Sequence, residues 1–140
     1  MDPISLFWVP QGTFLHVGFV VASIQDSVQS FAASVDATWD GEIIHDPNQL
    51  VQVTFLHGKH SADPPVELAE PAAEKSPVLG FLQRGGGLHH LCYQVDNLEE
   101  QLRRSRVAGG IITRPPLPAV AFGGRRTYTK NKLLIEYLES

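Results

Sequence analysis

Two histidines and two glutamates recur at matched places in the two halves of this sequence. His16 and His90 are 74 residues apart, and Glu67 and Glu136 are 69 residues apart. Two imidazoles and two carboxylates that meet in one cavity suit a divalent metal ion. Such a set leaves two positions of an octahedron for water or substrate, which is typical of a catalytic rather than a structural site. It favours Co, Ni, Mn, Fe or Zn over Ca, which needs more oxygen ligands.

This spacing reflects an internal repeat, because two pairs of segments match at constant offsets. FLHVGFVVASIQDSV (residues 14–28) matches LHHLCYQVDNLEEQL (88–102) at an offset of 74, which aligns the two histidines. VELAEP (66–71) matches IEYLES (135–140) at an offset of 69, which aligns the two glutamates. One short match between apolar strands can arise by chance, but two in the same order indicate a duplication.

Each repeat opens with an alternating apolar pattern, which predicts a half-buried strand followed by a helix. Because neighbouring side chains in a strand point to opposite faces, His90 should share a face with Cys92 and Gln94, away from the helix. His16 has the same parity as His90. His89, in contrast, should point to the helix side or cap the glycine turn that precedes it.

Capping signals mark the helices. Ser23 or Asp26 could cap the first helix, and Asp96 with Glu99 three residues later resembles a capping box at the start of the second. SPVLGFLQR (76–84) predicts a short bridging helix that is capped by its serine. The remaining strands are expected at residues 42–44, 51–57, 66–69, 111–113, 126–129 and 133–138.

The resulting order is βαβββ twice. It predicts an α+β fold in which paired βαβββ modules form a curved mixed sheet around a central cavity. Glu67 and Glu136 alternate with apolar neighbours, so both should line the concave face with the two histidines. The expected single compact domain comprises an N-terminal extension (1–12), a first module (13–72), a linker helix with a glycine turn (73–87) and a second module (88–140).

Composition excludes several classes of protein. The chain has 140 residues, of which 43% are hydrophobic and 19% charged, and its net charge of −4 argues against a general nucleic-acid-binding protein. A single cysteine, Cys92, excludes an internal disulfide and fits a reducing compartment. No apolar run reaches the roughly 18 residues of a membrane span, and the start lacks the basic region of a signal peptide. We therefore expect a cytoplasmic protein without membrane partners.

At the repeated histidines and glutamates, and in the segments around them, the chain resembles the vicinal oxygen chelate (glyoxalase/bleomycin-resistance-like) superfamily. Within it, the chain resembles the methylmalonyl-CoA epimerase family. The resemblance runs from Phe14 to the end and is carried by HVGFVV, VELAEP, LLIEYLE and above all SPVLGFLQRGGGLHHLCYQVDNLEEQL. It implies a homodimer built of paired modules around a divalent metal. It also implies that the metal ligands are His16, Glu67, His90 and Glu136.

The resemblance implies proton abstraction alpha to a thioester, with a metal that stabilises the enolate and Glu136 as the acid/base on one face. The family has a second glutamate where this chain has Asn48. Asp46, two residues away, is therefore the candidate for a second catalytic base. The candidate substrate-binding residues, with the arginines meeting a carboxylate or phosphate, are Asn48, Gln52, Arg125 and Arg126.

Other functions remain open for this fold. A glyoxalase-like isomerase or lyase needs one glutamate base, for which Glu136 suffices. A metal-free small-molecule-binding protein is disfavoured, because buried histidines and glutamates are costly without a cation. An Fe(II) dioxygenase prefers a single carboxylate, and Glu67 counts against it. The TKNK turn (129–132) is shorter than the corresponding turn in the epimerase family. The wall of the expected substrate cavity should therefore be shorter at this place.

Overall fold

The computed structural model describes residues 12–118 and 124–140, so nearly all of the expected N-terminal extension lies outside the described residues. The elements are β1 (Gly12–Val20), α2 (Ile24–Ser34), β2 (Ala37–Trp39), β3 (Ile44–Asp46), β4 (Val51–Gly58), β5 (Val66–Pro71), α3 (Leu79–Gln83), β6 (Gly87–Val95), α4 (Leu98–Val107), β7 (Ile111–Pro118), β8 (Arg125–Asn131) and β9 (Leu133–Glu139). None of the helices in these ranges is long and apolar enough to cross a membrane.

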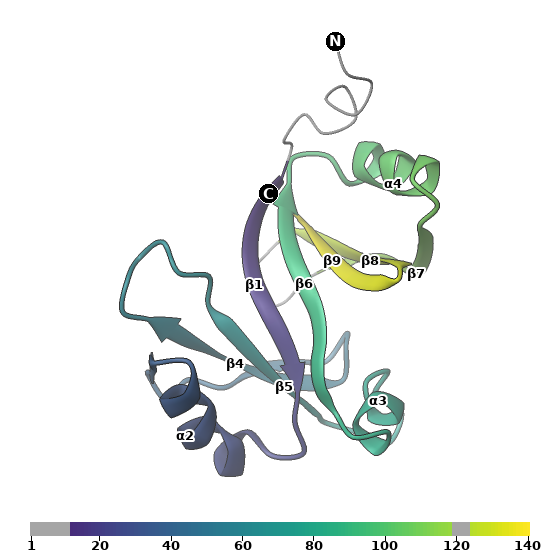
Figure 1. Ribbon diagram of the computed structural model, residues 1–140. Coiled ribbons are helices and arrows are strands. Elements are labelled where there is room, and N and C mark those ends of the chain that lie inside the picture. Colours follow the sequence, from purple (N-terminus) through teal and green to yellow (C-terminus); the bar gives the residue numbers. More distant parts are fainter. Residues whose placement is uncertain (1–11, 119–123) are drawn as a thin grey trace.

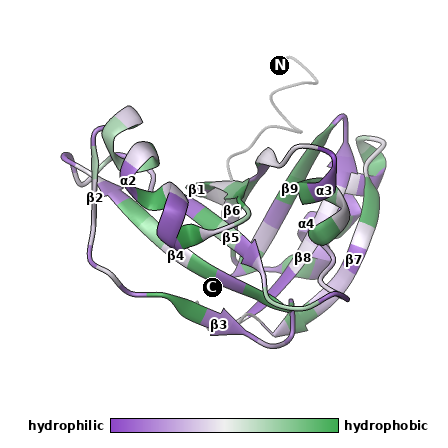
Figure 2. Ribbon diagram, turned by 90° about the horizontal axis from the view of Figure 1, so that it is seen from below, coloured by the Kyte–Doolittle hydropathy of each residue, from purple (hydrophilic) through white to green (hydrophobic). Residues whose placement is uncertain are grey.

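The described strands form one mixed sheet in the order β2-β4-β5-β1-β6-β9-β8-β7, with β3 paired to β4. The sheet is open rather than closed into a barrel. Its two central strands, β1 and β6, run antiparallel and side by side, with one half of the chain on either side of them (Figure 1). Figure 2, seen from below, shows how strongly the sheet curves.

The pairing of strands repeats in the two halves. β1 pairs in parallel with β5 and places Gly18 opposite Glu67, while β6 pairs in parallel with β9 and places Cys92 opposite Glu136. Gly18 and Cys92 are equivalent at the offset of 74, so the same register recurs in both halves. The predicted curved mixed sheet of paired βαβββ modules is therefore confirmed.

Local details differ from the sequence prediction at several element ends. Ser23 caps α2, whereas α4 is capped by Asn97 and not by Asp96, whose carboxylate instead accepts a hydrogen bond from Ser140. No side chain caps α3, because it begins at Leu79, after the turn that contains Ser76. β3 covers residues 44–46 rather than 42–44, and the three-residue β2 was too short to show a periodic pattern.

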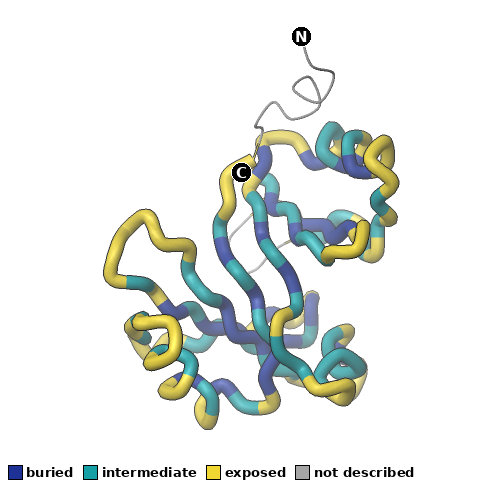
Figure 3. Tube along the Cα trace, viewed as in Figure 1, coloured by how far each residue is buried: buried dark blue, intermediate teal, exposed yellow. Residues whose placement is uncertain are grey.

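Helix α2 covers one face of the first half of the sheet. Its Ile24 and Val28 pack with Leu56 and Leu68 in a buried core cluster. Burying such side chains stabilises the fold by about 1.5–3 kcal/mol each. Exposure is concentrated on the outer helix surfaces and in loops, while the middle of the sheet is buried (Figure 3). Because α2 takes the apolar face of these strands, their alternate residues are left to line the concave face.

Candidate metal centre and its cavity

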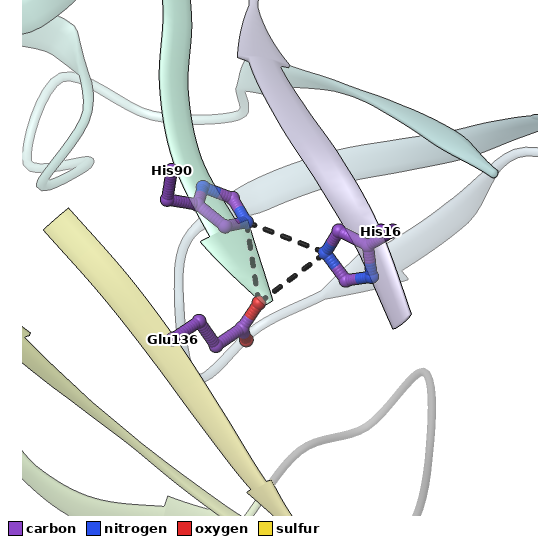
Figure 4. A group of neighbouring side chains, drawn as sticks. All are labelled: His16, His90 and Glu136. Carbon is purple, nitrogen blue, oxygen red and sulfur yellow. Dashed lines mark hydrogen bonds and ion pairs between the residues drawn. The ribbon is translucent and has the colours of Figure 1, made fainter. Parts of the chain in front are cut away.

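Four buried side chains from four strands meet on the concave face. His16 and His90 come from β1 and β6, Glu67 and Glu136 come from β5 and β9, and each is at most 4% exposed. The Nε2 atoms of the two histidines lie 3.3 Å apart. Oε1 of Glu136 lies 3.4 Å from Nε2 of His16 and 3.2 Å from Nε2 of His90. Figure 4 shows these three side chains pointing toward one another. The carboxylate oxygens of Glu67 lie 3.6 Å from Nε2 of His16 and 3.4 Å from Nε2 of His90.

These separations fit a metal ion. Two ligand atoms about 2.1 Å from one ion lie about 3.0 Å apart at a right angle and about 3.4 Å apart at a tetrahedral angle. Oε1 of Glu136 is buried and has no hydrogen bond of good geometry within residues 12–118 and 124–140, although Nε2 of both imidazoles lies within 3.4 Å of it. A cation bound between these groups would satisfy that oxygen. The four residues that the sequence singled out therefore converge on a site whose donors suit a divalent ion.

The carboxylate of Glu136 is ionised in this environment. Burial by itself raises its pKa, but the contacts with His16 and His90 and the charge of Arg126 outweigh burial and hold the pKa well below its usual range. For His90, burial lowers the pKa, but contact with Glu136 and the charge of Glu67 outweigh it and raise the pKa. The negative charge of the glutamates thus favours a bound cation.

Gly18 makes room for the ring of His90. The two residues are paired across β1 and β6, and a Cβ atom added at Gly18 would overlap three atoms of the His90 ring, including Nε2. Tyr128 contacts the same ring edge-on, with the ring centroids 5.8 Å apart. The sequence does not indicate a role for this glycine, because the requirement for a small residue comes from the ring of a residue on another strand.

We expect Gly18→Ala to displace the His90 ring and to weaken metal binding. The affinity for Co²⁺ should fall on the order of 100-fold or more, since changes beyond the ligands themselves already cost about 10- to 100-fold. Isothermal titration calorimetry measures this loss. Gly80→Ala in α3 is the matched control, because a Cβ there meets only the end of the Arg84 side chain. An unchanged Co²⁺ affinity in Gly18→Ala would contradict the position of His90 in the site.

His89 lies beside His90, and the prediction that it points to the helix side is wrong. The strand pairing passes from Gly18–His90 directly to Phe19–Leu88, so His89 is the extra residue of a β-bulge. The bulge turns its side chain toward the cavity, where its Nδ1 lies 2.8 Å from Nδ1 of His90. Burial and the neighbouring His90 lower the pKa of His89 to about 4. Strand parity failed here because it assumes regular pairing.

Arg126 connects the candidate metal site to Asp46. Its Nη1 donates to Oε2 of Glu136 at 2.8 Å, and its Nη2 donates to Oδ2 of Asp46 at 2.5 Å. The other oxygen of Asp46 accepts hydrogen bonds from the backbone N–H groups of Asn48 and Gln49. Asp46 is 1% exposed and does not line the cavity. Both of its carboxylate oxygens have partners, whereas Oε1 of Glu136 has none of good geometry among the described residues, so Asp46 suits a structural ion pair better than the second catalytic base that the sequence suggested.

A cavity of about 580 Å³ lies against the candidate metal site. Glu67, His90, Arg126 and Tyr128 line its buried end. Its more exposed lining carries four cationic side chains: Arg84, Arg114, Lys130 and Lys132. We call these four the basic rim. Within residues 12–118 and 124–140, no carboxylate forms an ion pair with any of them. No sequence pattern indicates the rim, because its members come from three separate parts of the chain.

Three of the predicted substrate-binding residues lie outside this cavity. Gln52 is flanked in β4 by the cavity-lining Val51 and Val53, so it points to the opposite face. Asn48 is exposed and does not line the cavity. Arg125 forms ion pairs with Glu99 and Glu139, at 2.9 Å each, away from the lining. Of the predicted set, only Arg126 reaches the cavity.

Known proteins share this arrangement of elements. The solved structure of a Streptomyces coelicolor methylmalonyl-CoA epimerase variant, in complex with 2-nitronate-propionyl-CoA, superimposes with a TM-score of 0.76 at 21% identity and covers 94% of this chain and 96% of that one. The ethylmalonyl-CoA/methylmalonyl-CoA epimerase of Cereibacter sphaeroides is 27% identical over 116 residues, covering 81% of this chain and 84% of the relative.

The mitochondrial methylmalonyl-CoA epimerase of Mus musculus is 33% identical over 89 residues. That match covers 62% of this chain and 48% of the mouse protein, so the chain spans about half of its length. Residues 15–129 match the glyoxalase/bleomycin resistance protein/dioxygenase superfamily. The chain belongs to this superfamily.

Proposed function

We propose that this protein is a metal-dependent epimerase that moves a proton alpha to the carbonyl of a CoA thioester such as methylmalonyl-CoA. The observation that carries the proposal is the convergence of two histidines and two glutamates beside a cavity with a basic rim. The epimerases among its relatives support the class of reaction.

The chain's own residues supply the proton chemistry. The metal held by His16, Glu67, His90 and Glu136 would provide positive charge for a substrate oxygen as negative charge develops on it. Glu136 is an ionised carboxylate at this position and can accept the alpha proton from one face of the carbon. Inversion then requires a proton from solvent on the opposite face, because both oxygens of Asp46 already have partners. Arg126 holds Glu136 through Oε2 and keeps its orientation fixed. Arg126 also lines the cavity, and its Nε is a buried donor that has no partner among the described residues, so its guanidinium is a candidate for binding a substrate carboxylate.

The basic rim supports an anionic carrier on the substrate. Arginine and lysine bind phosphate groups by charge and hydrogen bonding, and coenzyme A carries several phosphates. The net charge of the chain is −4, yet four cations at one cavity have no carboxylate partner among the residues that the structure describes. This local excess of positive charge favours a negatively charged ligand.

We expect reversal of charge at the rim to weaken binding without changing the chemical step. Lys130→Glu combined with Lys132→Glu should raise KM for methylmalonyl-CoA about 10- to 100-fold, with kcat changed less than about 3-fold. Steady-state kinetics at two salt concentrations measures this, and the effect should shrink at high salt. Lys75→Glu combined with Arg106→Glu changes the net charge equally on exposed residues outside the cavity. An equal rise of KM in both double variants would show that the rim has no specific role.

Exchange with solvent deuterium tests the proposed reaction. Metal-replete protein should wash deuterium into C2 of methylmalonyl-CoA, as followed by NMR, and absence of exchange would eliminate that substrate. Metal content is tested separately. Less than about a tenth of an equivalent of any divalent ion after reconstitution would contradict the metal-dependent mechanism.

A glyoxalase-like isomerase or lyase is the second candidate. It is favoured by the engagement of both Asp46 oxygens, whereas Oε1 of Glu136 stays available for proton transfer. A reaction with one base would wash deuterium into C2 with retention of configuration, whereas an epimerase exchanges and inverts it. The metal-free binding protein, the homodimer and the cytoplasmic location remain untested predictions.

A further inference from the structure

We infer that His89 is a positioning residue of the metal centre, which accepts a hydrogen bond from Nδ1 of His90 and so fixes the tautomer and orientation of that ligand. The inference rests on the proposed function, because it requires a metal at Nε2 of His90. It goes beyond the four ligands and gives a role to the first histidine of the LHH motif.

The two nitrogens of His90 have different surroundings. Nε2 faces His16, Glu67 and Glu136 at 3.2–3.4 Å, whereas Nδ1 lies 2.8 Å from Nδ1 of His89. A neutral imidazole carries one proton, and a nitrogen that binds a metal cannot carry it. The proton of a metal-bound His90 is therefore on Nδ1. It must be accepted by a lone pair, so Nδ1 of His89 is unprotonated and the proton of His89 is on Nε2.

The β-bulge makes this contact possible. In a regular strand, side chains of adjacent residues point to opposite faces and could not meet. The extra residue at His89 turns both rings to one side, with centroids 5.1 Å apart and planes at 90°. Phe81 of α3 supports the His89 ring from the other side, at a centroid distance of 4.9 Å.

The glycine run before the motif serves the same geometry. Gly85, Gly86 and Gly87 have φ values of 120°, 65° and 94°, a conformation that side chains other than glycine rarely adopt. These residues connect α3 to β6 within four positions, so Phe81 and His89 lie against each other. A metal-binding histidine usually donates its second N–H to a carboxylate, a backbone carbonyl or water. Here a neighbouring imidazole takes that place.

Two substitutions separate the hydrogen bond from the packing. His89→Phe keeps a ring beside Phe81 but removes the acceptor, and the affinity for Co²⁺ should fall about 10- to 100-fold. His89→Asn places an amide oxygen near the position of Nδ1 and should restore the affinity to within about 3-fold of wild type. Calorimetry measures the affinity, and the absorption spectrum of bound Co²⁺ should change in the Phe variant. His60→Phe on an exposed loop is the control.

The outcomes distinguish this inference from the proposed function. Wild-type protein that binds no Co²⁺ would defeat both. Wild-type binding together with an unchanged affinity and spectrum in His89→Phe would overturn the role of His89 alone. An equal loss in the Phe and Asn variants would do the same, because it would assign the effect to packing. Thermal unfolding of the chelator-treated variants verifies that they fold, and His89→Leu replaces the Phe variant if that one does not.

Discussion

Glu136→Gln should abolish proton exchange at C2, lowering the rate by at least about 1,000-fold. A glutamine has nearly the same shape but cannot accept a proton at neutral pH. It also cannot supply the negative charge that Glu136 places 3.2 Å from Nε2 of His90 and 2.8 Å from Nη1 of Arg126. Deuterium wash-in into methylmalonyl-CoA measures the loss.

The metal content of Glu136→Gln must be measured alongside the rate. If the variant still binds Co²⁺, the lost rate belongs to proton transfer, whereas loss of the ion would assign it to ligation. Glu99→Gln removes an exposed carboxylate outside the cavity and should leave exchange unchanged. Asn48→Ala should also have little effect, because Asn48 is exposed and does not line the cavity. Substantial exchange in Glu136→Gln would require a different base.

Arg126→Leu should lower the free energy of unfolding by about 3–5 kcal/mol. The guanidinium of Arg126 lies between the carboxylates of Asp46 and Glu136, and all three residues are at most 6% exposed. Without the guanidinium of Arg126, the carboxylates of Asp46 and Glu136 remain buried and lose their common partner. Urea denaturation of the metal-free variant and wild type, analysed by linear extrapolation, measures the difference.

The neighbouring arginine provides the matched control for this measurement. Arg125→Leu breaks exposed ion pairs with Glu99 and Glu139, which water and salt already screen, and should change stability little. Asp46→Asn should be intermediate, because an amide still accepts a hydrogen bond from Arg126 but loses the charge. Equal stability of Arg126→Leu and wild type would show that the buried ion pairs contribute nothing to folding.

The internal repeat and strand parity were sufficient to predict the four candidate ligands and the paired modules. His16, Glu67, His90 and Glu136 all lie on the concave face as expected. Both signals can be recognised without knowing the tertiary structure. The repeat follows from the alignment of short sequence segments, and parity follows from the geometry of a single strand. Where the pairing is regular, these signals translate directly into positions in space.

Parity also explains the position of Gln52, once the lining of the cavity is known. Gln52 alternates with Val51 and Val53, so its side chain lies on the face of β4 that points away from the cavity, which does not favour the predicted substrate contact. Asp46 was predicted as a second base, but its ion pair with Arg126 joins residues 80 positions apart. No pattern within one segment indicates such a partner.

Ligand type, repeat and parity can be recognised in short segments, so they were enough to identify the candidate metal ligands. The support of that site depends on tertiary contacts. The bulge at His89 depends on the register between β1 and β6, and the space at Gly18 depends on a ring from the other strand. The basic rim gathers side chains from three separate parts of the chain around one cavity. These features arise where strands meet, because register and packing are set by contacts between distant segments rather than by the residues of any one of them.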